Sequence, residues 1–172
     1  MSEPEGPSYR IEAIRAAHVR NDFDCGHPFL NHYLARYARQ NDRSGIARAF
    51  VMVPVPAGNP VVGYYTLAAG AVAFEKLPKA VRKKLPRYPV PVARIGELAV
   101  DERFQGKGLG SVLLIDALRR ILDASKEVAV WAVVVDPIDV QAACFYRKFG
   151  FEALADSEIM FLPMKEAATW LM

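Results

Sequence analysis

The sequence predicts a mixed α/β fold, and three observations support this class. Short stretches with the alternation or β-branched content of strands recur along the chain, apolar side chains at helical spacing fill several intervals, and no internal repeat appears. Of the 172 residues, 52% are hydrophobic and 24% are charged. We therefore expect a single domain over residues 1–172 with a substantial core, in which residues 1–8 are flexible.

The first half of the chain predicts three strands and two helices. Residues 9–14 alternate as a strand does, and residues 28–42 follow a first-turn proline with apolar side chains at helical spacing. Residues 47–55 and 61–74 are rich in β-forming side chains and flank the turn sequence PAGNP, so they should pair as an antiparallel hairpin. A short helix is expected over 75–85 (EKLPKAVRKKL), followed by the extended RYPVPV.

A strand, a glycine-rich turn and a helix follow one another in the second half. The strand is expected over 93–101 and the helix over 111–124, where apolar residues form a helical stripe. Residues 128–136 are nearly all apolar and β-branched, which is typical of a strand covered on both faces.

The C-terminal part predicts one more helix and a last strand. Residues 139–151 contain Asp139 as an N-cap and Gly150 as a C-terminal stop. Residues 158–164 read as a strand that precedes a short tail helix.

We expect neither a membrane span nor a secretory leader. No run of 18 apolar residues occurs, and the N-terminus MSEPEGPSYR lacks the basic-then-apolar order of a signal peptide. We expect a cytoplasmic protein in which Cys25 and Cys144 are reduced thiols. Cys25, His27 and His32 are metal-ligand types, but no second cysteine pair or orienting acid accompanies them, so a structural Cys25 and no metal are expected.

Three glycines, Gly106, Gly108 and Gly110, stand between the predicted strand and the following helix. In such a turn, backbone N–H groups and the positive end of the helix dipole converge on one anion. The spacing matches neither the dinucleotide pattern G-x-G-x-x-G nor the P-loop. The turn therefore predicts a phosphate or pyrophosphate site, with a helix-entry loop carrying spare glycines as the alternative.

Gln105 to Gly110 read Q-x-x-G-x-G, which resembles the acyl-coenzyme A signature of the GCN5-related N-acetyltransferases. The flanking strands ELAVD and VAVWAVVVD, and Tyr146 in ACFYRKFGF, occur in the order found in that family. The resemblance implies a central mixed, mostly antiparallel sheet of six to seven strands flanked by about four helices. A splayed strand pair would hold acetyl-CoA, which is the implied co-substrate, and no metal is implied.

Within that family the chain is similar to the acetyltransferase toxins of type II toxin–antitoxin modules, which acetylate the amino group of aminoacyl-tRNA. The similarity extends from about Ile11 to Met164 and is most specific in CGHPFLN and PKAVRKKLPRYPVP. It implies aminoacyl-tRNA as acceptor and a small antitoxin of the DNA-binding ribbon-helix-helix type. A homodimer is also implied.

Tyr146 is the candidate general acid, because a phenol of pKa about 10 can protonate a departing thiolate. The alternative is that Tyr146 is one more packed aromatic beside Phe145 and Phe149. Glu97 is a candidate base or a structural acid; the toxin branch commonly has Arg at this position, which puts the base role in doubt. An α-amino group of pKa about 7.7–8.0 beside an ester is substantially neutral without a base.

The remaining candidates bind rather than react. Backbone N–H groups of Leu98, Ala99 and Val100 would stabilise the oxyanion. The pyrophosphate would lie against the loop and the first turn of the helix, namely Gln105, Gly106, Lys107, Gly108, Leu109, Gly110 and Ser111.

The stretch from Lys76 to Arg94 carries Lys and Arg without an acid, as expected of a surface that meets tRNA phosphates. The candidates for tRNA binding are Arg36, Arg39, Lys76, Lys79, Arg82, Lys83, Lys84 and Arg87, with Arg43 beside them. An ordinary solvated helix face is the alternative. Acetylation of a small amine or a protein N-terminus, or a non-catalytic acyl-CoA- or RNA-binding module, also stays open.

Overall fold

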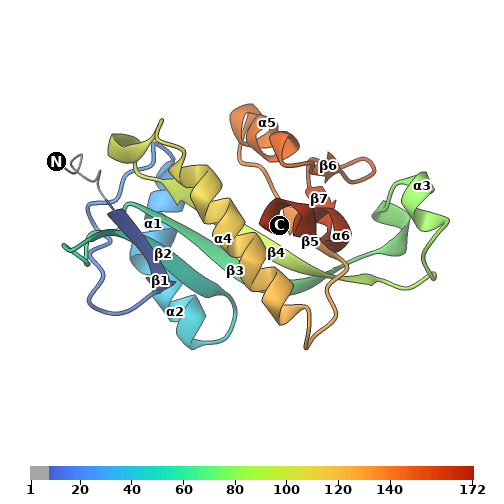
Figure 1. Cartoon of the computed structure of the whole chain (residues 1–172), viewed down its shortest axis with the longest axis horizontal. Helices are drawn as coiled ribbons and strands as arrows, with labels where there is room; N and C mark the ends of the chain where they lie inside the picture. The colour runs from blue at the N-terminus through green and yellow to red at the C-terminus, as the bar shows by residue number, and fades with distance from the viewer. Residues whose placement is uncertain (1–7) are drawn as a thin grey trace. The chain divides into compact units, whose positions relative to one another are not determined.

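A computed structural model of the chain describes residues 8–172. The segment predicted to be flexible, 1–8, lies outside the described residues except for Ser8, which already belongs to strand β1. Seven strands form one mostly antiparallel sheet in the order β1-β2-β3-β4-β5-β7-β6 (Figure 1). Their bounds are β1 Ser8–Ala13, β2 Arg48–Val55, β3 Gly63–Val72, β4 Val90–Val100, β5 Ala132–Val135, β6 Glu152–Ala153 and β7 Met160–Pro163.

Helices occupy the intervals that the sequence predicts. The α-helices are α1 Pro28–Arg36, α2 Ala38–Arg43, α3 Lys79–Arg82, α4 Leu109–Ala124, α5 Val140–Lys148 and α6 Met164–Ala167. Short 3-10 helices are η1 Phe74–Lys76, η2 Glu102–Phe104 and η3 Ala168–Leu171. The chain separates into two compact units: an N-terminal unit of residues up to Leu67 with Glu97–Asp116, and a C-terminal unit of Ala68–Gly96 with Ala117–Met172.

The N-terminal unit is built on the predicted hairpin. Strands β2 and β3 pair antiparallel from Arg48↔Leu67 to Met52↔Gly63, which confirms the pairing expected from the PAGNP turn. Alternate residues of β2 face opposite sides of the sheet. On one side a buried cluster joins β2 to α1 and α2 through Ala49, Val51, Val53, Leu30, Leu34 and Ala38. These two helices therefore cover one face of the hairpin.

Helix α4 covers the opposite face of the same strands within this unit. Phe50 of β2 stacks on Tyr65 of β3, with 5.3 Å between ring centroids, and the Tyr65 hydroxyl donates to Asp116 of α4. A Cβ on Gly63 would lie 2.9 Å from Leu113 Cδ1 and 3.2 Å from Ala99 O, so a larger residue where β3 meets α4 would displace the Leu113 side chain. The start of α4 is thereby fixed against the sheet.

The single helix predicted over 28–42 is two helices. Tyr37 ends α1 with φ −115° and ψ −29°, and α2 begins at Ala38. The backbone bonds still continue across the break, because Tyr37 N donates to Tyr33 O and Asn41 N donates to Tyr37 O, each at 2.8 Å. The prediction of helical structure was right, and its continuity was wrong.

A buried histidine fixes the carboxylate of Glu12 on β1. His18 is 3% exposed; its Nε2 lies 2.7 Å from Glu12 Oε1, and its Nδ1 accepts from Arg15 N at 2.8 Å. The hydrogen bond with His18, opposed by burial and joined by bonds from Arg15 and Arg10, lowers the pKa of Glu12 to about 2. Glu12 therefore stabilises the fold in its ionised form.

Replacing Glu12 by Gln should make stability less sensitive to acid. Because the folded pKa of Glu12 lies below its unfolded value, its contribution is complete above the unfolded pKa and is lost as pH falls through the folded pKa. We expect Glu12→Gln to cost about 1–3 kcal/mol of unfolding free energy at neutral pH, and this difference should shrink from about pH 5 to about pH 2. Urea unfolding at several pH values measures it; a difference independent of pH would contradict the assignment.

The C-terminal unit has its core around β5. Val92–Ile95 of β4 pair parallel with Ala132–Val135 of β5, which in turn pairs antiparallel with β7. All four residues of β5 are buried, as predicted for this strand. The strand is shorter than the predicted 128–136, because Pro91 has no N–H with which to extend the ladder before Val92. Val128 is accordingly 70% exposed.

Other elements of this unit follow their predicted signals or depart from them for local reasons. Asp139 caps α5 as predicted, accepting from Ala142 N at 2.8 Å. The helix expected over 75–85 is reduced to η1 and α3, because Pro78 can stand only at the start of a helix. Strand β6 was not predicted, since two residues are too few to show a period.

Candidate functional site

The turn between β4 and α4 has an open outer side. Gly106 and Gly108 both have φ +79°, a conformation that residues with a Cβ rarely adopt. A Cβ built on either would meet no atom within 4 Å. Among residues 8–172, no protein group accepts a hydrogen bond from the N–H groups of 106–111. These donors, at the N-terminus of a 16-residue helix, form a site suited to an anion.

A buried aspartate braces the base of this turn. Asp101 is 1% exposed and accepts hydrogen bonds from Arg103 Nε and Nη2, both at 3.0 Å, and from Asp24 N at 3.1 Å. Burial alone would raise the pKa of Asp101, but these hydrogen bonds together hold it below the usual value. The chain before α1 is thus attached to the end of β4 through a fixed carboxylate.

Gln105 makes a second connection between the same two segments. Its side-chain Nε2 donates to Val100 O at 2.8 Å and to Cys25 O at 3.3 Å. The Asn31 side chain, in turn, accepts from Cys25 N at 2.8 Å and donates to Asp24 Oδ1 at 2.9 Å. Gln105 therefore links the turn to the end of β4 and to the segment before α1. Its expected contact with a pyrophosphate stays a prediction.

Sequence reasoning missed this bracing network. Asp24, Asn31, Asp101 and Arg103 had no assigned role, although the polar stretch DFDCG has the composition of a hydrogen-bonded turn. The pairing of Asp24 with Asp101 spans 77 positions in the chain, so no local pattern indicates it.

Lys107 extends outward from the turn. Its Nζ lies 5.5 Å from the centroid of the Phe104 ring, and the Arg103 guanidinium carbon lies 5.8 Å from the same ring. The Arg103 guanidinium is paired with Asp101, so Lys107 is the cation that adds positive charge to this turn.

Glu97 lies on β4 against the neighbouring strand β3. Its carboxylate accepts the hydroxyl hydrogen of Thr66, and its backbone N donates to Thr66 Oγ1 at 3.1 Å. Thr66 is 1% exposed. The Glu97 side chain is therefore held in one place by a buried partner.

The strand register separates the last residues of β4 from β5. Parallel pairing with β5 ends at Ile95↔Val135, while β4 continues to Val100. Leu98, Ala99 and Val100, the predicted oxyanion donors, thus lie beyond the paired segment. This register is what the predicted divergence of the two strands requires.

Tyr146 belongs to the C-terminal unit, on α5. It is 7% exposed, and its ring packs on Phe145 and Phe151 at centroid distances of 5.2 and 5.3 Å. Burial raises the pKa of its phenol, so the hydroxyl carries its proton at neutral pH. The hydrogen bonds found within residues 8–172 include those of the Tyr64 and Tyr65 hydroxyls but none of the Tyr146 hydroxyl. The ring packs on its neighbours as the alternative expected, and the role of the hydroxyl as a general acid stays a prediction.

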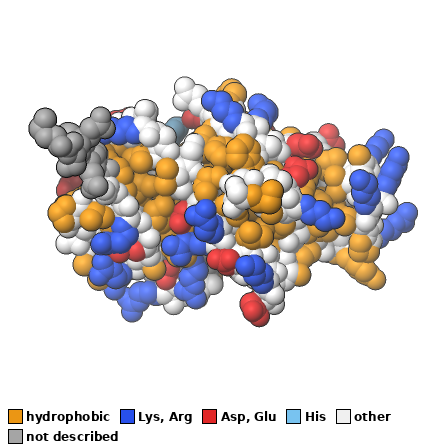
Figure 2. Space-filling model, in the orientation of Figure 1, with side chains coloured by type: hydrophobic (Ala, Val, Ile, Leu, Met, Phe, Trp, Pro, Cys, Tyr) orange, Lys and Arg blue, Asp and Glu red, His pale blue; other side chains and the backbone are white. Residues whose placement is uncertain are grey.

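The basic segment lies around α3 in the C-terminal unit. Of its candidate cations, only Arg82 is partly covered, and the exposed ones are Lys76, Lys79, Lys83, Lys84 and Arg87. Figure 2 shows Lys and Arg side chains gathered there. No ion pair neutralises these side chains within residues 8–172. Arg36 is exposed and Arg39 is half-buried on α1 and α2.

Cys25 has the features of a structural residue, as predicted. It is 6% exposed, its Sγ lies 3.7 Å from His27 O, and burial raises the pKa of its thiol. Over residues 8–172, no three His, Cys, Asp or Glu side chains gather as metal ligands. The helices of the same residues include none that is long and apolar enough to cross a bilayer.

Comparison with known sequences agrees with this geometry. A sequence profile described as acetyltransferase (GNAT) domain matches residues 58–153. The chain belongs to the GNAT acetyltransferase family. The matched residues of this acetyltransferase include the braced turn, all of α4 and Tyr146, and the predicted mixed fold of the family is confirmed.

A curated relative of this acetyltransferase and two solved structures are similar over nearly the whole chain. A Mycobacterium tuberculosis protein named tRNA-acetylating toxin is 40% identical over 146 residues, covering 84% of this chain and 86% of that protein. The structure of AtaT complexed with acetyl-methionyl-tRNAfMet has 29% identity and a TM-score of 0.88, covering 96% and 100% of the two chains. That of AtaTR bound with AcCoA has 30% identity and a TM-score of 0.84, covering 95% and 98%.

Proposed function

We propose that this acetyltransferase is a toxin that transfers acetyl from acetyl-CoA to the amino group of aminoacyl-tRNA and thereby blocks translation. The observation that carries this proposal is the 40% identity, over 84% of the chain, with a protein named tRNA-acetylating toxin. The resemblance of the fold to a structure complexed with acetyl-methionyl-tRNAfMet supports the same substrate class. A small antitoxin neutralises the protein.

Residues of this chain fit acetyl-CoA at the turn before α4. A pyrophosphate needs several N–H donors and space for close approach, and Gly106 and Gly108 leave that side of the backbone uncovered. Lys107 and the first turn of α4, Leu109 to Ser111, complete the contacts in this proposal. Backbone N–H groups of Leu98, Ala99 and Val100 polarise the thioester carbonyl.

The reaction exchanges a carbon–sulfur bond for a carbon–nitrogen bond. The neutral amine attacks the acetyl carbonyl carbon, the C–S bond breaks, and the nitrogen loses one proton to solvent or a base. Tyr146 gives its phenolic proton to the departing thiolate, and bulk water restores that proton afterwards. A phenol that burial keeps protonated has the form that a general acid needs.

Glu97 acts through its fixed position rather than as an obligatory base. Its carboxylate already accepts from Thr66, and an aminoacyl ester has a sufficiently neutral amine near pH 8. Glu97 then orients the incoming ammonium or amine by attraction.

The tRNA is held by its phosphates. The contacts come from Arg36 and Arg39 of the N-terminal unit and from six cations of the basic segment, Lys76, Lys79, Arg82, Lys83, Lys84 and Arg87.

We also propose one functional domain, because β3, β4 and α4 each run through both compact units. The protein acts in the cytoplasm as a homodimer, and its antitoxin is of the DNA-binding ribbon-helix-helix type.

Cell-free translation tests the toxin proposal. Adding the purified protein with acetyl-CoA to a translation extract should stop synthesis of a reporter protein, whereas the protein added after acetyl-CoA depletion should not. Restoring acetyl-CoA should restore the block. Inhibition that is equally strong without acetyl-CoA would contradict acetyl transfer as the cause.

A further inference from the structure

The outer surface of α1 and α2 carries aromatic and arginine side chains on both helices. Positions 29, 32 and 36 of α1 follow the three–four spacing that keeps side chains on one side of a helix, and positions 39 and 43 of α2 do the same after the break at Tyr37. Leu30, Leu34 and Ala38 on the other side are buried in the core. We name the outward residues Phe29, His32, Arg36, Arg39 and Arg43 the α1–α2 stripe.

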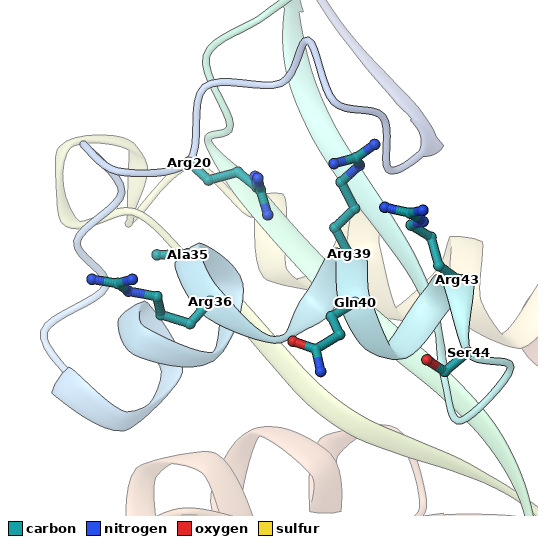
Figure 3. Close-up of a pocket in the computed structure, with 7 residues that line it drawn as sticks. All are labelled: Arg20, Ala35, Arg36, Arg39, Gln40, Arg43 and Ser44. Carbon is teal, nitrogen blue, oxygen red and sulfur yellow. The ribbon is translucent and has the colours of Figure 1, made fainter.

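A hollow of about 520 Å³ lies beside the C-terminal part of this stripe (Figure 3). Its polar lining consists of Arg20, Arg36, Arg39, Gln40, Arg43 and Ser44. Arg39 and Arg43 project to the same side of α2, and Arg20 points towards them from the loop before α1. Arg20 Nη1 donates to Leu34 O at 3.4 Å, so this arginine is held over the hollow.

The positive charge of the hollow is not balanced by a carboxylate. Asp42, the acid nearest in sequence, accepts from Arg48 Nη1 and from Ala49 N at 2.9 Å, so it is engaged by β2. Within residues 8–172, the three arginines of the stripe form no ion pair. Gathering four guanidinium groups without an acid costs folding free energy, which a bound anion offsets. Guanidinium groups bind phosphate in a bidentate manner.

Aromatic side chains occupy the N-terminal part of the stripe. Phe29 is 66% exposed, and His32 contacts the exposed ring of Tyr37 at a centroid distance of 5.4 Å. Exposed rings followed by arginines are the combination that binds single-stranded nucleic acid, because bases stack on the rings while phosphates pair with the cations. An acidic peptide would pair with the arginines and leave the rings unused.

We propose that the α1–α2 stripe and its hollow bind single-stranded RNA, with bases on Phe29 and His32 and backbone phosphates on the arginines. This inference rests on the proposed function, since the acceptor end of an aminoacyl-tRNA is single-stranded. It assigns that end to the N-terminal unit. The lysine-rich segment around α3 then supplies attraction to the rest of the tRNA without fixing its position.

Binding of a short RNA tests this assignment without any catalytic step. The probe is a fluorescein-labelled single-stranded RNA hexamer ending in CCA, and fluorescence anisotropy measures its Kd. Phe29→Ala should raise the Kd about tenfold through loss of a stacked base. Arg36→Ala/Arg43→Ala, at two exposed positions, should raise it about tenfold and reduce the slope of log Kd against log salt by about 1.4. Val128→Ala and Arg119→Ala, at exposed sites of the C-terminal unit, are matched controls and should bind as wild type.

Each outcome separates this inference from the proposed function. Wild-type Kd values in both stripe variants would overturn the inference, even if charged tRNA is acetylated. If the same variants lose binding of a labelled deca-glutamate peptide but keep RNA binding, the stripe is a protein-docking surface and the inference is overturned. If the variants lose RNA binding but the wild type acetylates no charged tRNA, the inference stands and the proposed function fails.

Discussion

Replacing Tyr146 by Phe should lower kcat for acetyl transfer about 100-fold or more, with the KM values for both substrates nearly unchanged. The ring would still pack on Phe145 and Phe151, because only the hydroxyl is removed. That hydroxyl bonds to no protein group among the described residues, so the unfolding free energy should change by less than about 0.5 kcal/mol. Steady-state kinetics and urea unfolding measure the two effects.

Tyr65→Phe is the matched control for the loss of a hydroxyl. The Tyr65 hydroxyl donates to Asp116, so its removal should cost about 1 kcal/mol of stability and leave kcat near wild type. Burial raises the pKa of Tyr146, so ionisation of this phenol should not reduce kcat up to about pH 9. A Tyr146→Phe protein with the full kcat would show that Tyr146 is only a packed aromatic.

Replacing Gly108 by Ala should raise the KM for acetyl-CoA about tenfold or more. The added methyl would enter the open side of the turn and keep the pyrophosphate at a distance from the backbone. Because alanine is strained at the positive φ of position 108, the substitution should also lower the unfolding free energy by about 1 kcal/mol. The KM for charged tRNA should stay near its wild-type value, because the basic side chains are unchanged.

Gly45→Ala is the control that separates the loss of stability, caused by alanine at a positive φ, from the rise in KM for acetyl-CoA. Gly45 has φ +74° and, like Gly108, nothing within 4 Å of a built Cβ, but it lies in the turn after α2. Both variants should therefore lose similar stability, about 2–4 °C in Tm. Only Gly108→Ala should show the raised KM. An equal KM in the two variants would mean that the turn at 106–108 does not bind the pyrophosphate.

The sequence predicted those parts of the fold that depend only on residues close together in the chain. The β2–β3 hairpin, the buried stripe of α4 and the Asp139 cap are each encoded within a few residues, and all are found in the structure. The length of β5 was overestimated, because apolar residues at 128–130 look like a strand whether or not Pro91 offers an N–H to pair with them. Pairing partners decide strand ends, and one segment does not reveal its partner.

The candidate site shows the same division between local and distant signals. The glycine turn and the helix after it were predicted, because their conformation follows from the spacing of Gly106 and Gly108. The connection from Asp24 to Asp101 was not, since it joins segments far apart in the sequence. The arginine hollow was not predicted: the sequence indicated Arg36, Arg39 and Arg43 as cations on one helix, and Arg20 joins them through the folded loop, outside the helical spacing.

Transfer of labelled acetyl to tRNA is the most direct test of the central claim. The purified protein is mixed with radiolabelled acetyl-CoA and either aminoacyl-tRNA or the same tRNA after its amino acid has been removed. The account predicts label on the charged tRNA, none on the uncharged tRNA, and release of the label as N-acetyl amino acid when the ester is hydrolysed. Label on neither tRNA, or on both equally, would contradict acetylation of the aminoacyl amino group.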